Sequence, residues 1–145
     1  MCLFPRAAIV SNLCWSVVIS KIFVPFILLF HPFLFMKYFC YVSDRVGTCY
    51  HEFYKGKWDG KTFWKSDSIL LHDDTLEELQ LYKAFTAVLP DYDPYGETQV
   101  NQSQWEAILD YASQLDTEAK PALTEATAWV KNVFENEGVF TILGI

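Results

Sequence analysis

One stretch of this sequence has carboxylates spaced as in a calcium-binding loop. Asp91 and Asp93 occupy the first and third positions and Gly96 the sixth, where such a loop needs oxygen ligands and a sharp turn. The match then fails, because Tyr95 stands at a ligand position and Gln102 replaces the glutamate expected at the twelfth. We therefore expect a solvated loop between two helices here, and no bound metal.

Groups that could act as acids or bases occur at two other places. His51 is followed by Glu52, and His72 is followed by Asp73 and Asp74. No His or Cys spacing marks a metal site, and no third group that would orient a catalytic histidine can be identified. The G-x-S-x-G, P-loop and G-x-G-x-x-G motifs are also missing from the sequence. We therefore predict a non-enzymatic protein without a cofactor. Asp73 and Asp74 are expected to favour the start of a helix, because negative charge is stabilised at a helix N-terminus.

Acidic side chains gather at the expected helix starts and in the loops between helices, with tyrosines among them. Such a surface is typical of a protein that masks a basic partner, because complementary charge speeds encounter and aromatic side chains supply buried anchors. Small acidic immunity proteins that inhibit nuclease toxins share this composition, although no motif supports the likeness. We predict a binding module, inhibitor or immunity-like, for a basic protein; an acidic surface without a partner is the alternative. The candidate protein-binding residues are Asp73, Asp74, Glu77, Asp91, Tyr92, Asp93, Tyr95 and Glu97.

A second candidate surface alternates lysines with aromatic residues between Lys55 and Lys65. It contains four lysines and three aromatic residues. This pattern is typical of single-stranded nucleic-acid binding and also of the lipid headgroup layer, where Trp and Lys are both favoured. A hairpin with solvated lysines is the third interpretation. The candidate headgroup-facing residues are Lys55, Lys57, Trp58, Lys61 and Trp64.

Charge is divided unevenly along the 145 residues, whose formal net charge is -7. Residues 1–71 contain eight Lys or Arg and four Asp or Glu. Residues 72–145 contain three Lys or Arg and fourteen Asp or Glu. The acidic half repels nucleic acid and favours basic partners. Binding of nucleic acid is therefore not expected, and nothing in the sequence indicates a small-molecule ligand.

An almost wholly apolar run extends from Ala7 to Met36, with Lys21 as its one certain charge. It exceeds the roughly 20 residues that a membrane-spanning helix needs. We expect a single-pass anchor over residues 1–36, with the acidic domain of residues 37–145 on the cytoplasmic side because positive charge is in excess after the run. This gives an alternative function, a membrane protein whose cytoplasmic domain serves a membrane assembly. Met36 also looks like a translation start, which would make residues 1–36 mistranslated upstream sequence and the protein cytoplasmic.

The helices and strands that would position these side chains follow from residue types and from the residues that typically begin and end such elements. Strands are predicted at 37–43 and 48–54, joined as a hairpin, and near 62–71. Helices are predicted from Thr75 to Pro90, from Asn101 or Ser103 to about residue 115, and from about residue 117 to Gly138. The apolar tail 139–145 should be a buried strand that pairs with the hairpin. The fold class is therefore α+β: an antiparallel sheet of four or five strands, an N-terminal meander plus a C-terminal strand, with three helices on one face.

Overall fold

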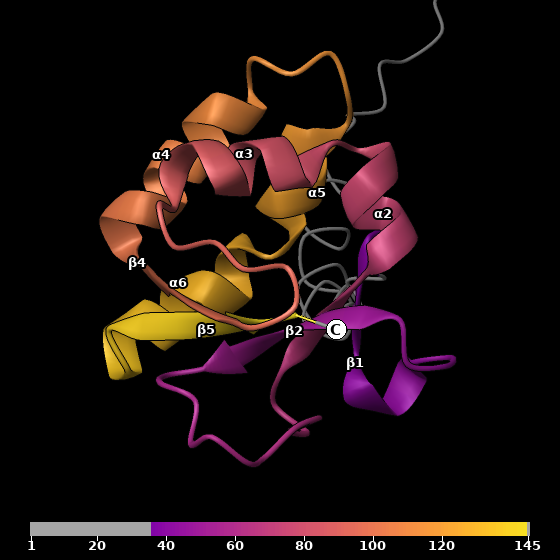
Figure 1. The fold of residues 1–145 in the computed structure, drawn as a ribbon, viewed down its shortest axis with the longest axis vertical. Coiled ribbons are helices and arrows are strands. Elements are labelled where there is room, and N and C mark those ends of the chain that lie inside the picture. Colours follow the sequence, from indigo (N-terminus) through magenta and orange to yellow (C-terminus); the bar gives the residue numbers. More distant parts are fainter. Residues whose placement is uncertain (1–35, 145) are drawn as a thin grey trace, which may run out of the picture. The chain divides into compact units, whose positions relative to one another are not determined.

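The computed structural model describes residues 36–144. These residues form a five-stranded antiparallel sheet with five α-helices (Figure 1), so the predicted α+β class is confirmed. The strands are β1 (Phe39–Tyr41), β2 (Tyr50–Lys55), β3 (Ile69–His72), β4 (Glu97–Asn101) and β5 (Val139–Leu143). The helices are α2 (Asp73–Glu78), α3 (Leu81–Val88), α4 (Gln102–Ala112), α5 (Ala119–Glu125) and α6 (Thr127–Asn136), and a short 3-10 turn, η1, spans Val42–Asp44.

The predicted membrane anchor, residues 1–36, lies outside the described residues except for Met36. Within residues 36–144 no helix combines the length and the apolar character that crossing a membrane requires. The cytoplasmic placement of the acidic domain stays a prediction.

The strand order in the sheet is β1-β3-β2-β5-β4, so the predicted N-terminal meander is wrong, and so is the hairpin between its first two strands. Cys40 of β1 pairs with Leu70 of β3, whose other neighbour is Glu52 of β2. The reason is burial, because Ile69 and Leu71 are fully buried as well as Leu70, and a strand that is apolar on both faces is favoured between two others. The short strand β1 is left at the edge.

The C-terminal strand is buried inside the sheet, as its composition predicts. Residues Phe140–Leu143 are all buried, and β5 pairs antiparallel with β2, Phe53 lying opposite Ile142. Strand β4, which was not predicted, covers the other side of β5. Its residues alternate between exposed and buried, with Thr98 and Val100 facing inward, as expected for an edge strand.

Five helices replace the predicted three, because the first and third predicted helices are each divided. The first is interrupted at Gln80, whose φ of 57° is left-handed. The Thr117 hydroxyl donates to the carbonyl of Leu79 at 3.0 Å, so this carbonyl is bound from outside the helix. The third is divided at the buried Ala126, where a tight turn bonds its N–H to the carbonyl of Leu123.

The helix starts also differ in part from the prediction. His72, not Thr75, caps α2, since its Nδ1 accepts from the N–H of Asp74 at 3.1 Å. Asn101 caps α4, and Gln104 completes the capping box. Asn101 was one of the two predicted caps, and Ser103 was the other.

The hydrophobic core lies between the helices and one face of the sheet, which Figure 1 shows edge-on beneath α3. Phe53, Phe140 and Ile142 provide sheet positions of this core, and Phe85 and Leu123 come from the helices. Glu125 ties the edge to the helices, because its carboxylate accepts from the backbone N–H groups of residues 37, 38 and 39. The helices therefore pack on one face, as predicted.

The opposite face of the sheet holds a buried carboxylate. Glu52 is 1% exposed, and its two oxygens accept from the N–H of Trp64 at 2.7 Å and from the N–H of Lys65 at 3.0 Å. Trp64 has a φ of 59°, an unusual conformation for a bulky residue. Glu52 therefore fixes the loop between β2 and β3 on the sheet.

The described cysteines, Cys40 and Cys49, are free thiols. Cys40 is half-buried, and burial raises the pKa of its thiol. Cys49 is exposed.

Candidate protein-binding cleft

A buried histidine links the sheet to the start of α2. His51 lies on the helix-facing side of β2, its side chain 2% exposed, and its Nε2 is 3.0 Å from Oδ1 of Asp73, the first residue of α2. The N–H of Asp73 also donates to the carbonyl of Cys49 at 3.0 Å. Asp73 is thus held by both its backbone and its side chain.

The hydrogen bonds of His51 indicate its tautomer. Its Nδ1 is buried and has no partner among residues 36–144. A neutral ring that carries its proton on Nε2 donates to Asp73 and leaves only a lone pair unpaired, which costs less than an unpaired N–H. In the described part of the chain no hydrogen bond joins this pair to a third side chain, so its geometry is that of a structural link.

A cleft of about 280 Å³ opens beside this pair, between α2, α3 and the loop that precedes β4. Asp73, Glu77, Tyr92 and Tyr95, four of the eight predicted protein-binding residues, line it. We call it the acidic cleft. Its lining residues are His51, Asp73, Leu76, Glu77, Tyr82, Thr86, Tyr92, Pro94 and Tyr95.

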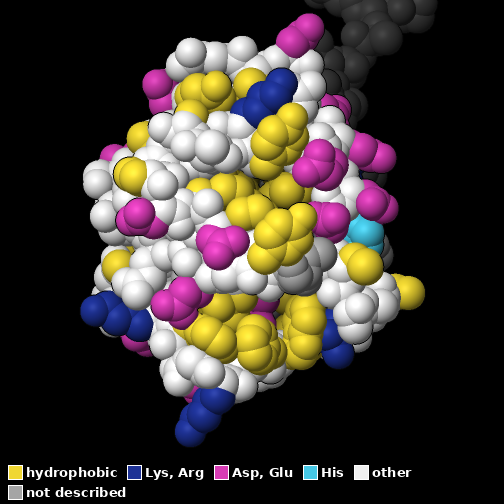
Figure 2. Space-filling view, in the orientation of Figure 1, with side chains coloured by type: hydrophobic (Ala, Val, Ile, Leu, Met, Phe, Trp, Pro, Cys, Tyr) yellow, Lys and Arg dark blue, Asp and Glu magenta, His cyan; other side chains and the backbone are white. Residues whose placement is uncertain are grey.

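The other predicted protein-binding residues lie around the acidic cleft without lining it. Asp91 and Glu97 line a neighbouring hollow of about 250 Å³. Asp74 is exposed on the first turn of α2, and Asp93 is exposed in the loop before β4. Figure 2 shows acidic side chains gathered over α2, beside hydrophobic side chains near the centre of the view.

The loop before β4 is fixed by its own hydrogen bonds. Asp93 accepts from the N–H of Tyr95 at 2.9 Å, and its own N–H donates to Oγ1 of Thr98 at 3.0 Å. The N–H of Gly144 donates to the carbonyl of Gly96 at 2.8 Å. Tyr95, 82% exposed, therefore stands on a supported loop rather than a free one.

The calcium-like spacing in this loop brings no metal site together. The carboxylate of Asp93 is turned toward the loop backbone, and Asp91 lines the neighbouring hollow. Among residues 36–144 no group of three or more His, Cys, Asp or Glu side chains is placed to hold a metal ion.

The pKa of Tyr92 is raised in the acidic cleft. Its pKa is raised to about 12, first by burial and then by the charges of Asp73, Glu77 and Asp93. An unfolded tyrosine loses its proton near pH 10. Between about pH 10 and 12 the unfolded chain therefore binds fewer protons than the folded one, and this group makes stability fall as the pH rises.

Tyr92→Phe is expected to leave the free energy of unfolding at pH 7 unchanged or to raise it by up to about 1 kcal/mol. The reason is that the Tyr92 hydroxyl is buried without a partner among the described residues, and an unsatisfied buried group costs free energy. The variant should also lose less stability than the wild type above pH 10. Urea denaturation at pH 7 and across pH 9–11 measures both effects. Tyr95→Phe, at an exposed ring, is the control and should keep the wild-type pH dependence. A marked destabilisation by Tyr92→Phe at pH 7 would contradict the conclusion that the Tyr92 hydroxyl has no hydrogen-bond partner among residues 36–144.

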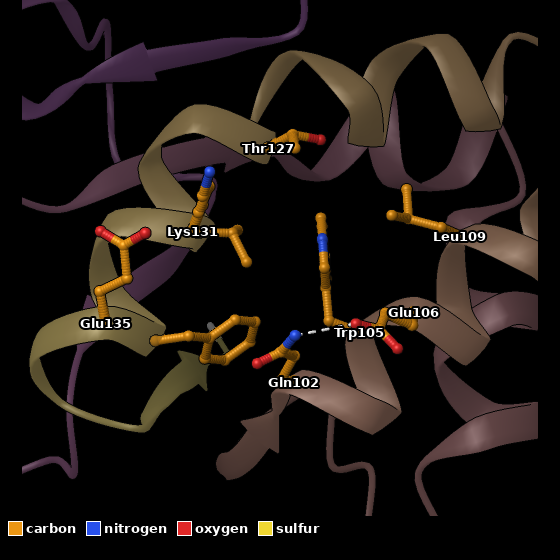
Figure 3. A pocket seen from close by; sticks show the side chains of 9 residues that line it. Gln102, Trp105, Glu106, Leu109, Thr127, Lys131 and Glu135 are labelled. Atoms are coloured by element: carbon orange, nitrogen blue, oxygen red, sulfur yellow. Dashed lines mark hydrogen bonds between the residues drawn. The ribbon is translucent and has the colours of Figure 1, made fainter.

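A second hollow, of about 370 Å³, lies between α4 and α6 and was not predicted as a site. Figure 3 shows the Trp105 ring standing between α4 and the side chains of α6, with Lys131 and Glu135 on one side and Leu109 on the other. The Trp105 indole N–H is buried and has no partner among residues 36–144. The residues that line this hollow were predicted only as parts of two helices.

The predicted headgroup-facing residues lie away from the acidic cleft, on β2 and the loop after it. Lys57 and Lys61 are exposed. Lys55 pairs with Asp67, its Nζ 3.7 Å from Oδ2. Trp58 and Trp64 are half-buried.

Comparison with known proteins places this chain in no family. No family model, curated protein or solved structure matches it. Its function must therefore be inferred from the geometry and charge of its own side chains.

Proposed function

We propose that this chain is a non-enzymatic protein-binding module, inhibitor-like or immunity-like, that holds a basic protein at the acidic cleft. The observation that supports this most is the meeting of Asp73 and Glu77, from α2, with Tyr92 and Tyr95, from the loop before β4, around one cleft. Acid and tyrosine on a single concave surface are complementary to a cationic side chain.

The chemistry of the cleft favours arginine or lysine from the partner. No Lys or Arg is among the residues that line it, so an entering cation would meet Glu77 without competition. Tyrosine rings attract cations through their faces, most strongly when water is excluded. Arginine, which is planar and weakly hydrated, fits such a site better than lysine does.

The outer part of the surface suits a protein partner. Tyr95 is 82% exposed, and large exposed aromatic side chains commonly become the buried anchors of interfaces. Since the loop beneath it is held by Asp93 and Thr98, little conformational entropy would be lost on binding. Asp74, Asp91 and Glu97 extend the negative field, which would speed the encounter at low salt.

The test is binding of a fluorescent arginine-rich peptide to the full chain, with a citrulline-substituted peptide of the same length as the neutral control. Glu77→Gln and Tyr95→Ala should each weaken arginine-peptide binding by about tenfold, a typical loss for an interface anchor. The matched controls are Glu106→Gln on α4 and Tyr41→Ala on β1, which should change binding by less than about twofold.

Two further outcomes decide the proposal. The affinity for the arginine peptide should fall steeply with salt, and the citrulline peptide should bind weakly at every salt concentration. Equal losses in the cleft variants and in the controls would mean that the whole acidic surface attracts the peptide, which would overturn the cleft as the site.

A further inference from the structure

Two loops beside the sheet expose large apolar side chains. Val46, in the loop after η1, is 83% exposed, and Phe63, in the loop between β2 and β3, is 49% exposed. The guanidinium of Arg45 lies 4.3 Å from the ring centroid of Trp64, so the two loops are in contact. We call residues 45–47 and 57–65 together the basic end. In Figure 1 the loop between β2 and β3 lies at the opposite end of the view from α3.

The tip of the longer loop is rigidly built. The carboxylate of Asp59 accepts from the N–H of Lys61 at 3.0 Å and from the N–H and hydroxyl of Thr62 at 2.7 and 2.5 Å. The Trp58 indole N–H donates to the Thr62 carbonyl at 2.7 Å, and the Trp58 ring lies 4.9 Å from that of Phe63. Phe63 is therefore presented in a fixed position.

Both ends of this loop are fastened to the sheet. Glu52 holds the N–H groups of Trp64 and Lys65, and the carbonyl of Gly56 accepts from the Thr141 hydroxyl at 2.8 Å. A contact made by the loop would therefore orient the whole domain and not the loop alone.

The cations of the basic end differ in availability. Arg45 and Lys65 lie over the rings of Trp64 and Tyr54. Lys57 and Lys61 are exposed, and neither forms an ion pair with any residue from 36 to 144. Two free ammonium groups thus stand on the same short loop as the exposed Phe63.

We propose that the basic end docks this domain onto an anionic lipid bilayer. Lys57 and Lys61 would lie among lipid phosphates, and Phe63 and Val46 would enter the interfacial layer, where aromatic side chains are favoured. Single-stranded nucleic acid is disfavoured, because bases need free aromatic faces for stacking, and Trp58 and Trp64 are already in contact with Phe63 and Arg45. The acidic cleft, which a negative membrane repels, would remain available to a protein.

The experiment places the full chain on nanodiscs that carry a paramagnetic headgroup lipid and records the broadening of its amide NMR signals. One disc contains phosphatidylcholine alone, and the other contains about 30% phosphatidylserine. We expect residues 45–47 and 57–63 to broaden at least threefold more on the anionic disc, while residues 73–77 and 95 differ little between discs. The neutral disc accounts for any effect of the apolar run of residues 7–36.

Matched variants separate lipid docking from simple charge. Each lysine near an anionic surface contributes about fivefold in affinity, so Lys57→Gln with Lys61→Gln should abolish the difference between discs. Lys83→Gln with Lys131→Gln, an equal change of charge on α3 and α6, should preserve it. Phe63→Ser should reduce it at unchanged charge, with far-ultraviolet circular dichroism confirming the fold.

The remaining outcomes contradict the proposal. Equal broadening on both discs, or equal loss in both lysine pairs, would remove the basic end as a lipid site. A single-stranded oligonucleotide that shifts the signals of residues 57–65, without broadening of these residues on anionic discs, would assign the surface to nucleic acid.

Discussion

Glu52→Gln is expected to lower the free energy of unfolding by about 2–4 kcal/mol. Each oxygen of this buried carboxylate accepts one backbone N–H, and hydrogen bonds to a charged group contribute about 1.5–3 kcal/mol each. Glutamine has one acceptor oxygen and an NH₂ group, so in the same position one donor would face another. The loss therefore exceeds that of a simple charge removal, and urea denaturation of the full chain measures it.

Glu97→Gln is the matched control for this change. Glu97 of β4 and Glu52 of β2 both pair with Leu143 of β5, so they belong to the same row of the sheet. Glu97 is exposed, and its variant should stay within about 0.5 kcal/mol of the wild type. Similar unfolding free energies for the two variants would show that the two N–H bonds of Glu52 do not hold the loop.

Local patterns predicted the fold class but not the order of the strands. The apolar run 139–145 could be placed inside the sheet because burial on both faces depends on composition alone. The partner of β1 could not be predicted this way, since a turn at residues 44–47 is compatible both with a hairpin and with a longer path that admits β3. The full burial of Leu70, known only from the folded structure, decides between them.

The break in the first predicted helix was missed because its cause lies far away in the sequence. Leu79 looks like the middle of a helix, and what binds its carbonyl is the hydroxyl of Thr117, 38 residues later. The first cap was missed because the helix begins earlier, at Asp73, where the ring of His72 accepts from the N–H of Asp74.

The acidic cleft could be predicted in composition but not in shape. Asp73, Glu77, Tyr92 and Tyr95 were identified from charge and residue type, whereas the link from His51 to Asp73 was not identified. A signal for it exists, because pairing of β2 with β3 places His51 opposite Leu71, two residues before Asp73. The hollow between α4 and α6 has no such signal, since its walls are the same apolar residues that a packed core would need.

Phe140→Ala is expected to cause the largest loss of stability, about 3–5 kcal/mol, as for other buried Phe→Ala changes. Phe140 is 0% exposed. Its ring centroid lies 5.4 Å from that of Phe53, 5.6 Å from that of Trp105 and 5.8 Å from that of Phe134. Truncation would thus leave a cavity where the sheet, α4 and α6 meet, beneath the hollow that Trp105 lines.

Phe140→Leu keeps most of the volume and should cost only about 1–2 kcal/mol, which provides a measurable variant if the alanine variant does not fold. Phe63→Ala removes the same ring from an exposed site and should cost less than about 1 kcal/mol. Urea denaturation monitored by tryptophan fluorescence ranks the three variants by their free energy of unfolding. Because Trp105 contacts Phe140 directly, the leucine variant should also shift the tryptophan emission, whereas Phe63→Ala should shift it only through Trp58. An alanine variant at position 140 as stable as the one at position 63 would mean that the core is not centred on β5.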